Sequence, residues 1–201
     1  MGKELEYKLY VPDEDTLLRV LADDEIASLC TGIWQSTQMK TTYVDSDDRR
    51  FGLHHWTLRR RMEGEKSVVC LKTPQNEAHT RGEWQIEAES VDEIAIKRLI
   101  ESGAPKTLLL LYGDGKLRPI CGAEFLRRSV MLEFPDGSRA ELAGDCGILS
   151  GPTQTLSFTE LELERYAGAP TAMIALVQTL CARYGLREQP LSKSARARRL
   201  K

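Results

Sequence analysis

The sequence predicts an α+β protein whose sheet is largely antiparallel. Three observations lead to this prediction: hairpin-sized connections join the strand-like segments, charged and apolar residues alternate along most of them, and apolar stripes with helical spacing occur near 17–29, 94–100 and 173–180. No low-complexity linker divides the chain, so we expect one domain, residues 1–201.

The elements of the first half can be assigned in order. Charged and apolar residues alternate strictly over residues 4–9, which predicts a strand. A helical stretch with apolar residues between 17 and 29 follows this strand. Ser90 and Glu93 have the spacing of a capping box, so we expect a helix from there to about Ser102. The remaining strands of this half are expected at 33–45, 56–62, 67–73 and 82–89.

The second half repeats this plan more loosely. Pro170 comes before an apolar helix that Gly185 closes, and the chain ends in the strongly basic segment 191–201. Strands are expected at 124–134, 138–144 and 156–165.

Charged side chains share one face of several predicted strands. The acidic positions are Glu4 and Glu6, beside Lys8, on the first strand, and Glu160, Glu162 and Glu164 on a late one. Carboxylates in a row repel one another unless cations lie nearby. Basic residues recur with the same period at Arg59, Arg61, Lys72, Arg81 and Arg127.

These faces fit a closed barrel. About eight antiparallel strands enclose room for side chains or one small ligand. A solvated face is the better interpretation of any one strand, but together the strands predict a cavity for a metal ion and a polyanion. If the charged faces point inward, the three helical stripes must cover the apolar outer faces.

Composition excludes several classes of protein. The balance of 28 Lys and Arg against 30 Asp and Glu argues against nucleic-acid binding driven by overall charge. The longest apolar run, 108–112, is too short for a bilayer, and the charged N-terminus lacks the features of a secretory signal. The five cysteines are widely spaced without a C-x-x-C pair, which favours free thiols in a reducing cytoplasm.

The chain resembles the CYTH domains, also called triphosphate tunnel metalloenzymes. Their N-terminal ExExK is similar to ELEYK at 4–8. Arg81 and Glu83 resemble the family's R-x-E, although Gln85, two residues further on, stands where many members carry another acid. Further segments resemble family motifs in the family's order: YVDSDDRRF (43–51), LRRR (58–61), VVCLK (68–72), RGE (81–83), Arg127, AELAGDCG (140–147), ELELE (160–164) and SKSARA (192–197).

The resemblance implies a closed eight-stranded antiparallel barrel that forms a triphosphate tunnel, with helices packed outside. It also implies an enzyme that needs Mg²⁺ or Mn²⁺. We expect hydrolysis of inorganic triphosphate, with weaker activity on nucleoside triphosphates. A class IV-type adenylate cyclase or a thiamine triphosphatase is the alternative on the same scaffold. A non-catalytic polyphosphate- or nucleotide-binding module is less favoured, because binding alone needs fewer acids.

The resemblance also implies roles for individual residues. Hard cations prefer oxygen ligands, and the expected metal ligands are Glu4, Glu6, Glu160, Glu162 and Glu164. Four of these (Glu4, Glu6, Glu162 and Glu164) are, with Lys8, the expected catalytic residues. Phosphate oxygens are expected to bind Lys8, Arg59, Arg61, Lys72, Arg81, Arg127, Lys193 and Arg196. Glu83, Glu141 and Asp145 are expected just outside the metal ligands.

Two questions about this assignment stay open at this point. Lys193 and Arg196 close one tunnel mouth unless their basic segment is a disordered tail. The expected partner is a small-molecule triphosphate, with no nucleic acid and no membrane, and a homodimer is an open option for assembly.

Overall fold

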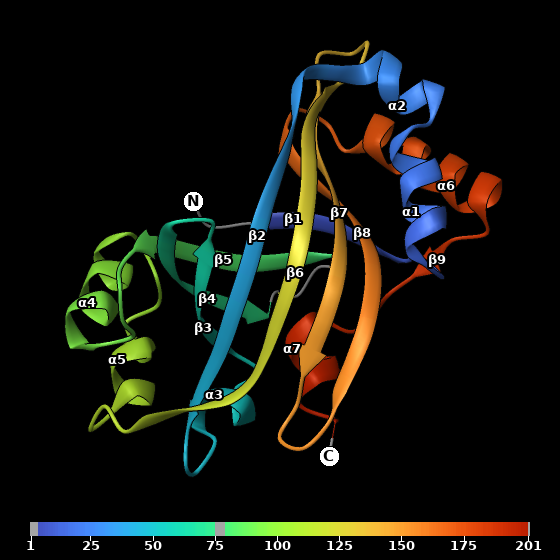
Figure 1. Ribbon diagram of the computed structural model, residues 1–201. Coiled ribbons are helices and arrows are strands. Elements are labelled where there is room, and N and C mark those ends of the chain that lie inside the picture. The colour runs from blue at the N-terminus through green and yellow to red at the C-terminus, as the bar shows by residue number, and fades with distance from the viewer. Residues whose placement is uncertain (1–3, 75–78, 201) are drawn as a thin grey trace.

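Eight strands form a closed antiparallel barrel in the computed structural model, which describes residues 4–74 and 79–200. Their order is β1–β8–β7–β6–β2–β3–β4–β5, and β5 pairs back to β1 (Figure 1). A short extra strand, β9 (Arg187–Glu188), pairs with the other end of β1. The predicted fold class is therefore confirmed.

The strands are longer than their alternation predicted in three cases. β2 begins at Cys30 rather than 33, β6 begins at Leu117 rather than 124, and β7 continues to Ser150 rather than 144. Cross-strand pairing forms the extensions: β2 pairs with β6, with a register shift between Tyr43 and Val44, and the end of β7 pairs with β6 and β8. This pairing cannot be read from any one segment alone. The bounds are β1 (Glu4–Tyr10), β2 (Cys30–Ser46), β3 (Thr57–Glu63), β4 (Lys66–Pro74), β5 (Thr80–Glu87), β6 (Leu117–Glu133), β7 (Arg139–Ser150) and β8 (Thr155–Ala167).

Helices cover two sides of the barrel, as the apolar stripes predicted. One side carries α1 (Glu14–Leu21), α2 (Asp24–Leu29) and α6 (Thr171–Tyr184). The other carries α3 (Arg50–Leu53), α4 (Glu93–Glu101) and α5 (Thr107–Tyr112). A last helix, α7 (Lys193–Ala197), packs against β6 and β7.

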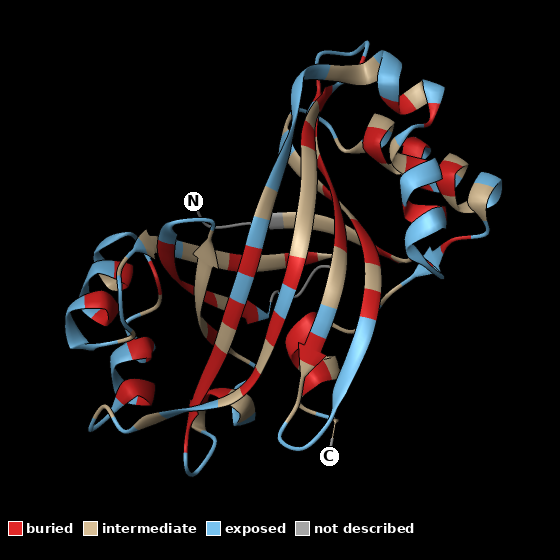
Figure 2. Cartoon of the chain, viewed as in Figure 1, coloured by how far each residue is buried: buried red, intermediate tan, exposed pale blue. Residues whose placement is uncertain are grey.

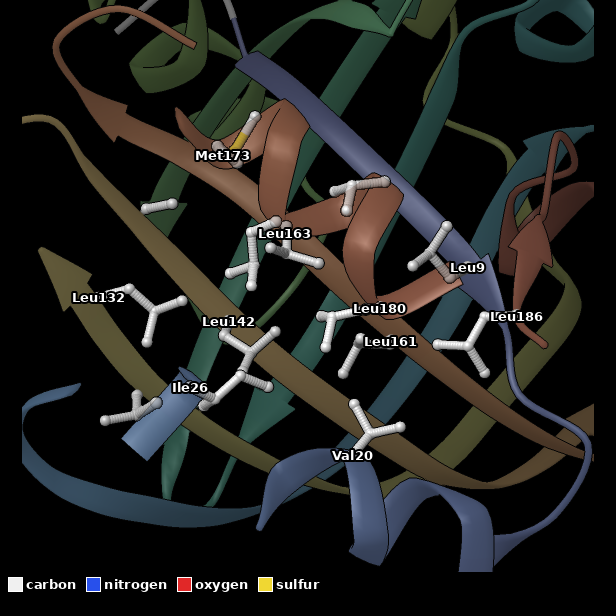
Figure 3. Packing of buried hydrophobic residues seen from close by; sticks show 14 of the residues in the cluster. Leu9, Val20, Ile26, Leu132, Leu142, Leu161, Leu163, Met173, Leu180 and Leu186 are labelled. Carbon is white, nitrogen blue, oxygen red and sulfur yellow. The ribbon is translucent and has the colours of Figure 1, made fainter. Parts of the chain in front are cut away.

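The outward faces of the strands are apolar and buried. Leu9 of β1 and Leu161 of β8 pack with Val20 of α1 and Leu180 of α6, all at most 1% exposed (Figure 3). Burial of each such side chain is worth about 1.5–3 kcal/mol. Because successive residues of a strand face opposite ways, this outer core turns the charged residues of β1 and β8 into the barrel.

The helix starts differ in part from the prediction. The capping box at Ser90 is wrong: Asp92 caps α4, and its Oδ1 accepts a hydrogen bond from the Ala95 N–H at 2.9 Å. An aspartate directly before the helix competes successfully for this role. The stretch expected near 17–29 is two helices, each with its own aspartate cap, Asp13 and Asp23.

The helix after Pro170 ends at Gly185 as predicted, with Gly185 in the left-handed region at φ 67°. The sequence interpretation missed α3, α5, α7 and β9, which are all short. Within residues 4–74 and 79–200, no helix has the length and apolar character needed to cross a bilayer.

Candidate active site in the barrel

The barrel encloses a cavity of about 850 Å³ to which every strand except the short β9 contributes side chains. The predicted inward orientation of the charged faces is thus what the structure shows. The predicted site residues that line the cavity are Glu6, Lys8, Arg59, Arg61, Lys72, Arg81, Glu83, Arg127, Glu141, Glu162, Glu164 and Lys193.

The other predicted site residues lie outside this lining. Asp145 and Glu160 are fully buried, with side chains 0% exposed, and Arg196 contacts Glu160 from α7. Glu4 pairs through its backbone with Arg81 of β5, and its side chain lies outside the described residues.

A cluster of three carboxylates surrounds Lys193. Its ammonium lies 2.7 Å from Asp145, 2.5 Å from Glu160 and 2.7 Å from Glu162. The three carboxylates also lie within 4.8 Å of one another, a spacing that suits a metal ion, but here the Lys193 ammonium lies among them. Burial disfavours the ammonium, yet Asp145 and Glu160 raise the pKa of Lys193 above its usual value.

Arg127 completes the charge balance of this cluster. Its guanidinium makes two hydrogen bonds to Asp145, at 2.8 and 2.7 Å, and a third to Glu162. Burial raises the pKa of Glu162, but Lys193 and Arg127 hold this pKa well below its usual value. Glu160 differs, because burial raises its pKa to about 7 despite Lys193.

The C-terminal segment is held at the cavity rather than forming a disordered tail. Ser192 caps α7 by accepting a hydrogen bond from the Ala195 N–H at 3.1 Å, and α7 is largely buried in Figure 2. The Lys193 ammonium lies 5.1 Å from the ring centre of Phe125 and 5.4 Å from that of Phe158. These contacts, added to the carboxylates, fix the place of α7.

A second group of carboxylates centres on Glu164. Glu6 on β1 and Glu141 on β7 are its direct cross-strand neighbours. Burial raises the pKa of Glu164 to about 7, and the negative charges of Glu83, Glu6 and Glu141 add to the rise while Lys72 opposes it. Glu6, Glu164 and Glu141 therefore form a row of neighbouring carboxylates, and a divalent cation would relieve their mutual repulsion.

Basic groups on β3 and β4 form another part of the wall. Lys72 Nζ lies 2.9 Å from Glu83 Oε2, and Arg59 Nη2 lies 3.6 Å from Glu83 Oε1. The Cys70 thiol donates to the same carboxylate at 3.0 Å, and burial raises the pKa of this thiol to about 12, so it remains protonated.

Comparison with protein families agrees with this geometry. The model of the CYTH domain matches residues 2–197 of the chain. The chain belongs to the CYTH family.

Similar solved structures share the CYTH fold at low sequence identity. A Hippeastrum protein, described as a candidate adenylyl cyclase with a dominant triphosphatase activity, is 16% identical with a TM-score of 0.61, over 98% of this chain and 95% of its own. A Pyrococcus horikoshii protein is 15% identical with a TM-score of 0.59, over 96% of each chain. A candidate adenylate cyclase from Bacillus halodurans is 16% identical with a TM-score of 0.57, also over 96% of each chain.

Sequence reasoning missed one charged group of this CYTH cavity. Glu63 lines the cavity and binds Arg61. The period of two along a strand could have found it, because Glu63 follows Arg59 and Arg61 on one face. Arg60, between Arg59 and Arg61 on β3, does not line the cavity; it is half-buried and donates to Ser67 Oγ at 2.9 Å.

Proposed function

We propose that this CYTH protein is a metal-dependent triphosphatase that hydrolyses inorganic triphosphate, and nucleoside triphosphates less well, inside the barrel. The observation that carries the proposal is the division of the cavity wall. A row of neighbouring carboxylates on β1, β8 and β7 centres on Glu164, while guanidinium and ammonium groups on β3, β4 and β6 line another part of the cavity. A polyanion with a bound cation matches both parts.

The carboxylates around Glu164 suit Mg²⁺ or Mn²⁺. Glu6, Glu162 and Glu164 would hold the ion, with Glu4 contributed by the same strand as Glu6 and Glu141 nearby. The raised pKa of Glu164 fits this role, because a cation stabilises carboxylates that otherwise repel one another. The ion supplies charge neutralisation for the phosphates and a more acidic bound water.

Glu160 has a different role in this proposal from the one expected of it. Its two oxygens bind Lys193 and Arg196, so it anchors α7 at the wall. Asp145, also fully buried, orients Arg127 and Lys193 in the same way. Both carboxylates therefore position basic side chains that bind phosphate.

The basic residues would bind and orient the phosphate chain. Arg127 and Arg59 present planar guanidinium groups suited to two phosphate oxygens, while Lys8, Lys72 and Lys193 offer point charges. Arg61 and Arg81 line the same cavity. Phosphoryl transfer depends mainly on positioning and charge stabilisation, which this wall supplies without a covalent nucleophile.

An adenylate cyclase is the second candidate, since its triphosphate cradle would be the same. The Hippeastrum protein favours the hydrolase by analogy, because its triphosphatase activity dominates. We also propose that residues 1–201 act as one CYTH domain in a reducing cytoplasm, because all five cysteines are free thiols.

The experiment is a substrate screen with the purified full chain. Inorganic tripolyphosphate, thiamine triphosphate and nucleoside triphosphates are each incubated with Mg²⁺ or Mn²⁺, and both phosphate and cyclic nucleotide are measured. We expect phosphate release, fastest from tripolyphosphate. Cyclic AMP as the main product from ATP would replace the hydrolase by the cyclase, and thiamine triphosphate as the fastest substrate would change the substrate assignment.

A further inference from the structure

An arginine and a glutamate pair on one strand at the edge of the cavity. Arg61 Nε donates to Glu63 Oε1 at 2.6 Å, and Nη2 contacts the same oxygen. Both side chains line the cavity and are mostly buried, 13% exposed for Arg61 and 29% for Glu63. This pair lies apart from the carboxylates of β1, β7 and β8.

The position of Glu63 is at one end of the phosphate-binding wall. Along β3, Thr57, Arg59, Arg61 and Glu63 share the inward face, with neighbours separated by about 6.8 Å. Thr57, at the start of the strand, lines a second opening together with Ser192 and Ser194 of the α7 segment. Glu63 is therefore at the end of β3 that lies away from α7.

The surroundings of Arg61 explain why Glu63 turns toward it. Burial lowers the pKa of Arg61, and the positive charges of Arg59 and Arg127 lower it further, while Glu63 opposes this shift. Glu63 also has Lys66 directly opposite on β4, yet Lys66 pairs with Glu87 instead. The Glu63 carboxylate thus serves as a counter-charge for a guanidinium that would otherwise bind an anion.

We propose that Glu63 is a specificity-determining residue that occupies Arg61 at this end of the cavity and selects against phosphate chains longer than three. This inference rests on the proposed function. A fourth phosphate that extends toward this end must displace the Glu63 carboxylate from Arg61 and then lie beside it. Repulsion between the two anions disfavours the longer chain, and specificity often depends on such a repulsive element.

The test replaces Glu63 by glutamine, which keeps the shape and a hydrogen-bond acceptor but removes the charge. Inorganic tripolyphosphate and tetrapolyphosphate are compared by kcat/KM and KM. We expect Glu63→Gln to reduce the preference for tripolyphosphate by about tenfold, mainly through a lower KM for tetrapolyphosphate. Glu63→Ala, with thermal unfolding to verify folding, should shift the preference in the same direction.

Glu87→Gln is the matched control. Glu87 is a carboxylate near the same β3–β4 turn, but it is 73% exposed, pairs with Lys66 at 3.9 Å and does not line the cavity. We expect it to leave the preference unchanged. An unchanged preference in both Glu63 variants, or an equal shift in Glu87→Gln, would overturn the proposal.

Equilibrium binding separates this inference from the proposed function. Both polyphosphates are titrated calorimetrically into each variant with EDTA present, so that no turnover is needed. A changed binding preference without hydrolysis in the metal-containing assay supports Glu63 and refutes the triphosphatase. Hydrolysis with an unchanged preference supports the triphosphatase and refutes the role of Glu63. If neither polyphosphate binds the unaltered protein, either in EDTA or with Mg²⁺, both proposals are overturned.

Discussion

Replacing Lys193 by methionine should strongly destabilise the protein. The ammonium lies 2.5 to 2.7 Å from three carboxylates, two of which are fully buried. Methionine fills most of the same space without the charge, so Asp145, Glu160 and Glu162 are left with Arg127 and Arg196 alone. Breaking a buried ion pair on one side costs about 3–5 kcal/mol of unfolding free energy. For a chain of this size, that corresponds to a melting temperature lower by roughly 6–20 °C.

The cost should also increase with pH. Glu160 has a pKa of about 7 even beside Lys193, which is above its unfolded value, so its stabilising protonated form is lost as pH rises through 7. Removing Lys193 raises that pKa further and leaves more of the carboxyl protonated at pH 6. The variant should therefore lose less stability relative to the unaltered protein at pH 6 than at pH 8.5.

The assay is urea unfolding at the two pH values, with Lys97→Met as control. Lys97 pairs with Glu93 at 2.6 Å but is 58% exposed, so its loss should cost less than about 0.5 kcal/mol. A second variant, Lys193→Met with Glu160→Gln, should recover part of the loss. A cost for Lys193→Met below about 1 kcal/mol, or one that is equal at both pH values, would refute the role given to this network.

Three further predictions concern the fold. Asp45→Ala should cost about 3 kcal/mol in urea unfolding, because the buried carboxylate accepts hydrogen bonds at 2.9 to 3.0 Å from the backbone N–H groups of Ser46, Phe51 and Gly52. A cost below about 1 kcal/mol would contradict this. Leu99→Ala should cost about 2–5 kcal/mol of unfolding free energy, since Leu99 of α4 is 0% exposed where the helix packs on the barrel. Leu110→Ala is the control: Leu110 is 77% exposed, so its loss should change stability by less than about 0.5 kcal/mol. Equal effects of the two substitutions would contradict the packing. Gly147→Ala should cost about 1–3 kcal/mol by calorimetric melting, because a Cβ there would lie 2.5 Å from the Cα of Phe125; unchanged melting would show that β6 and β7 are less tightly packed.

The barrel could be predicted because its signals are local. Alternation along ELEYK and ELELE indicates which residues share a face of the strand. The apolar stripes of the helices indicate that helices cover the apolar faces of the strands. Inward charges were consistent with these two facts, and the resemblance to the CYTH domains implied the closed eight-stranded tunnel. The cap of α4 could not be settled in this way, because Ser90 and Asp92 both suit the role and only the backbone path decides between them.

The partners within the site could not be predicted, because they depend on long-range register. Lys193 lies 33 residues after Glu160, and nothing in either segment indicates that an ammonium neutralises the middle of the acidic cluster. The role expected of Glu160 as a metal ligand therefore competes with an ion pair that only the fold reveals. For Glu63, the alternation along β3 could have predicted that its side chain faces the cavity. Only the structure shows that this carboxylate binds Arg61.

The most direct test of the triphosphatase measures phosphate release from inorganic tripolyphosphate by the unaltered protein and by Glu6→Gln, with Mg²⁺ and with EDTA. We predict that hydrolysis requires the metal and that Glu6→Gln lowers kcat/KM by about 100-fold, since Glu6 lines the cavity beside Glu164. Glu133→Gln, which alters an exposed carboxylate on β6, should have no effect. Hydrolysis that persists in EDTA, or equal rates for Glu6→Gln and the unaltered protein, would contradict the assignment of the barrel cavity as a metal–triphosphate site.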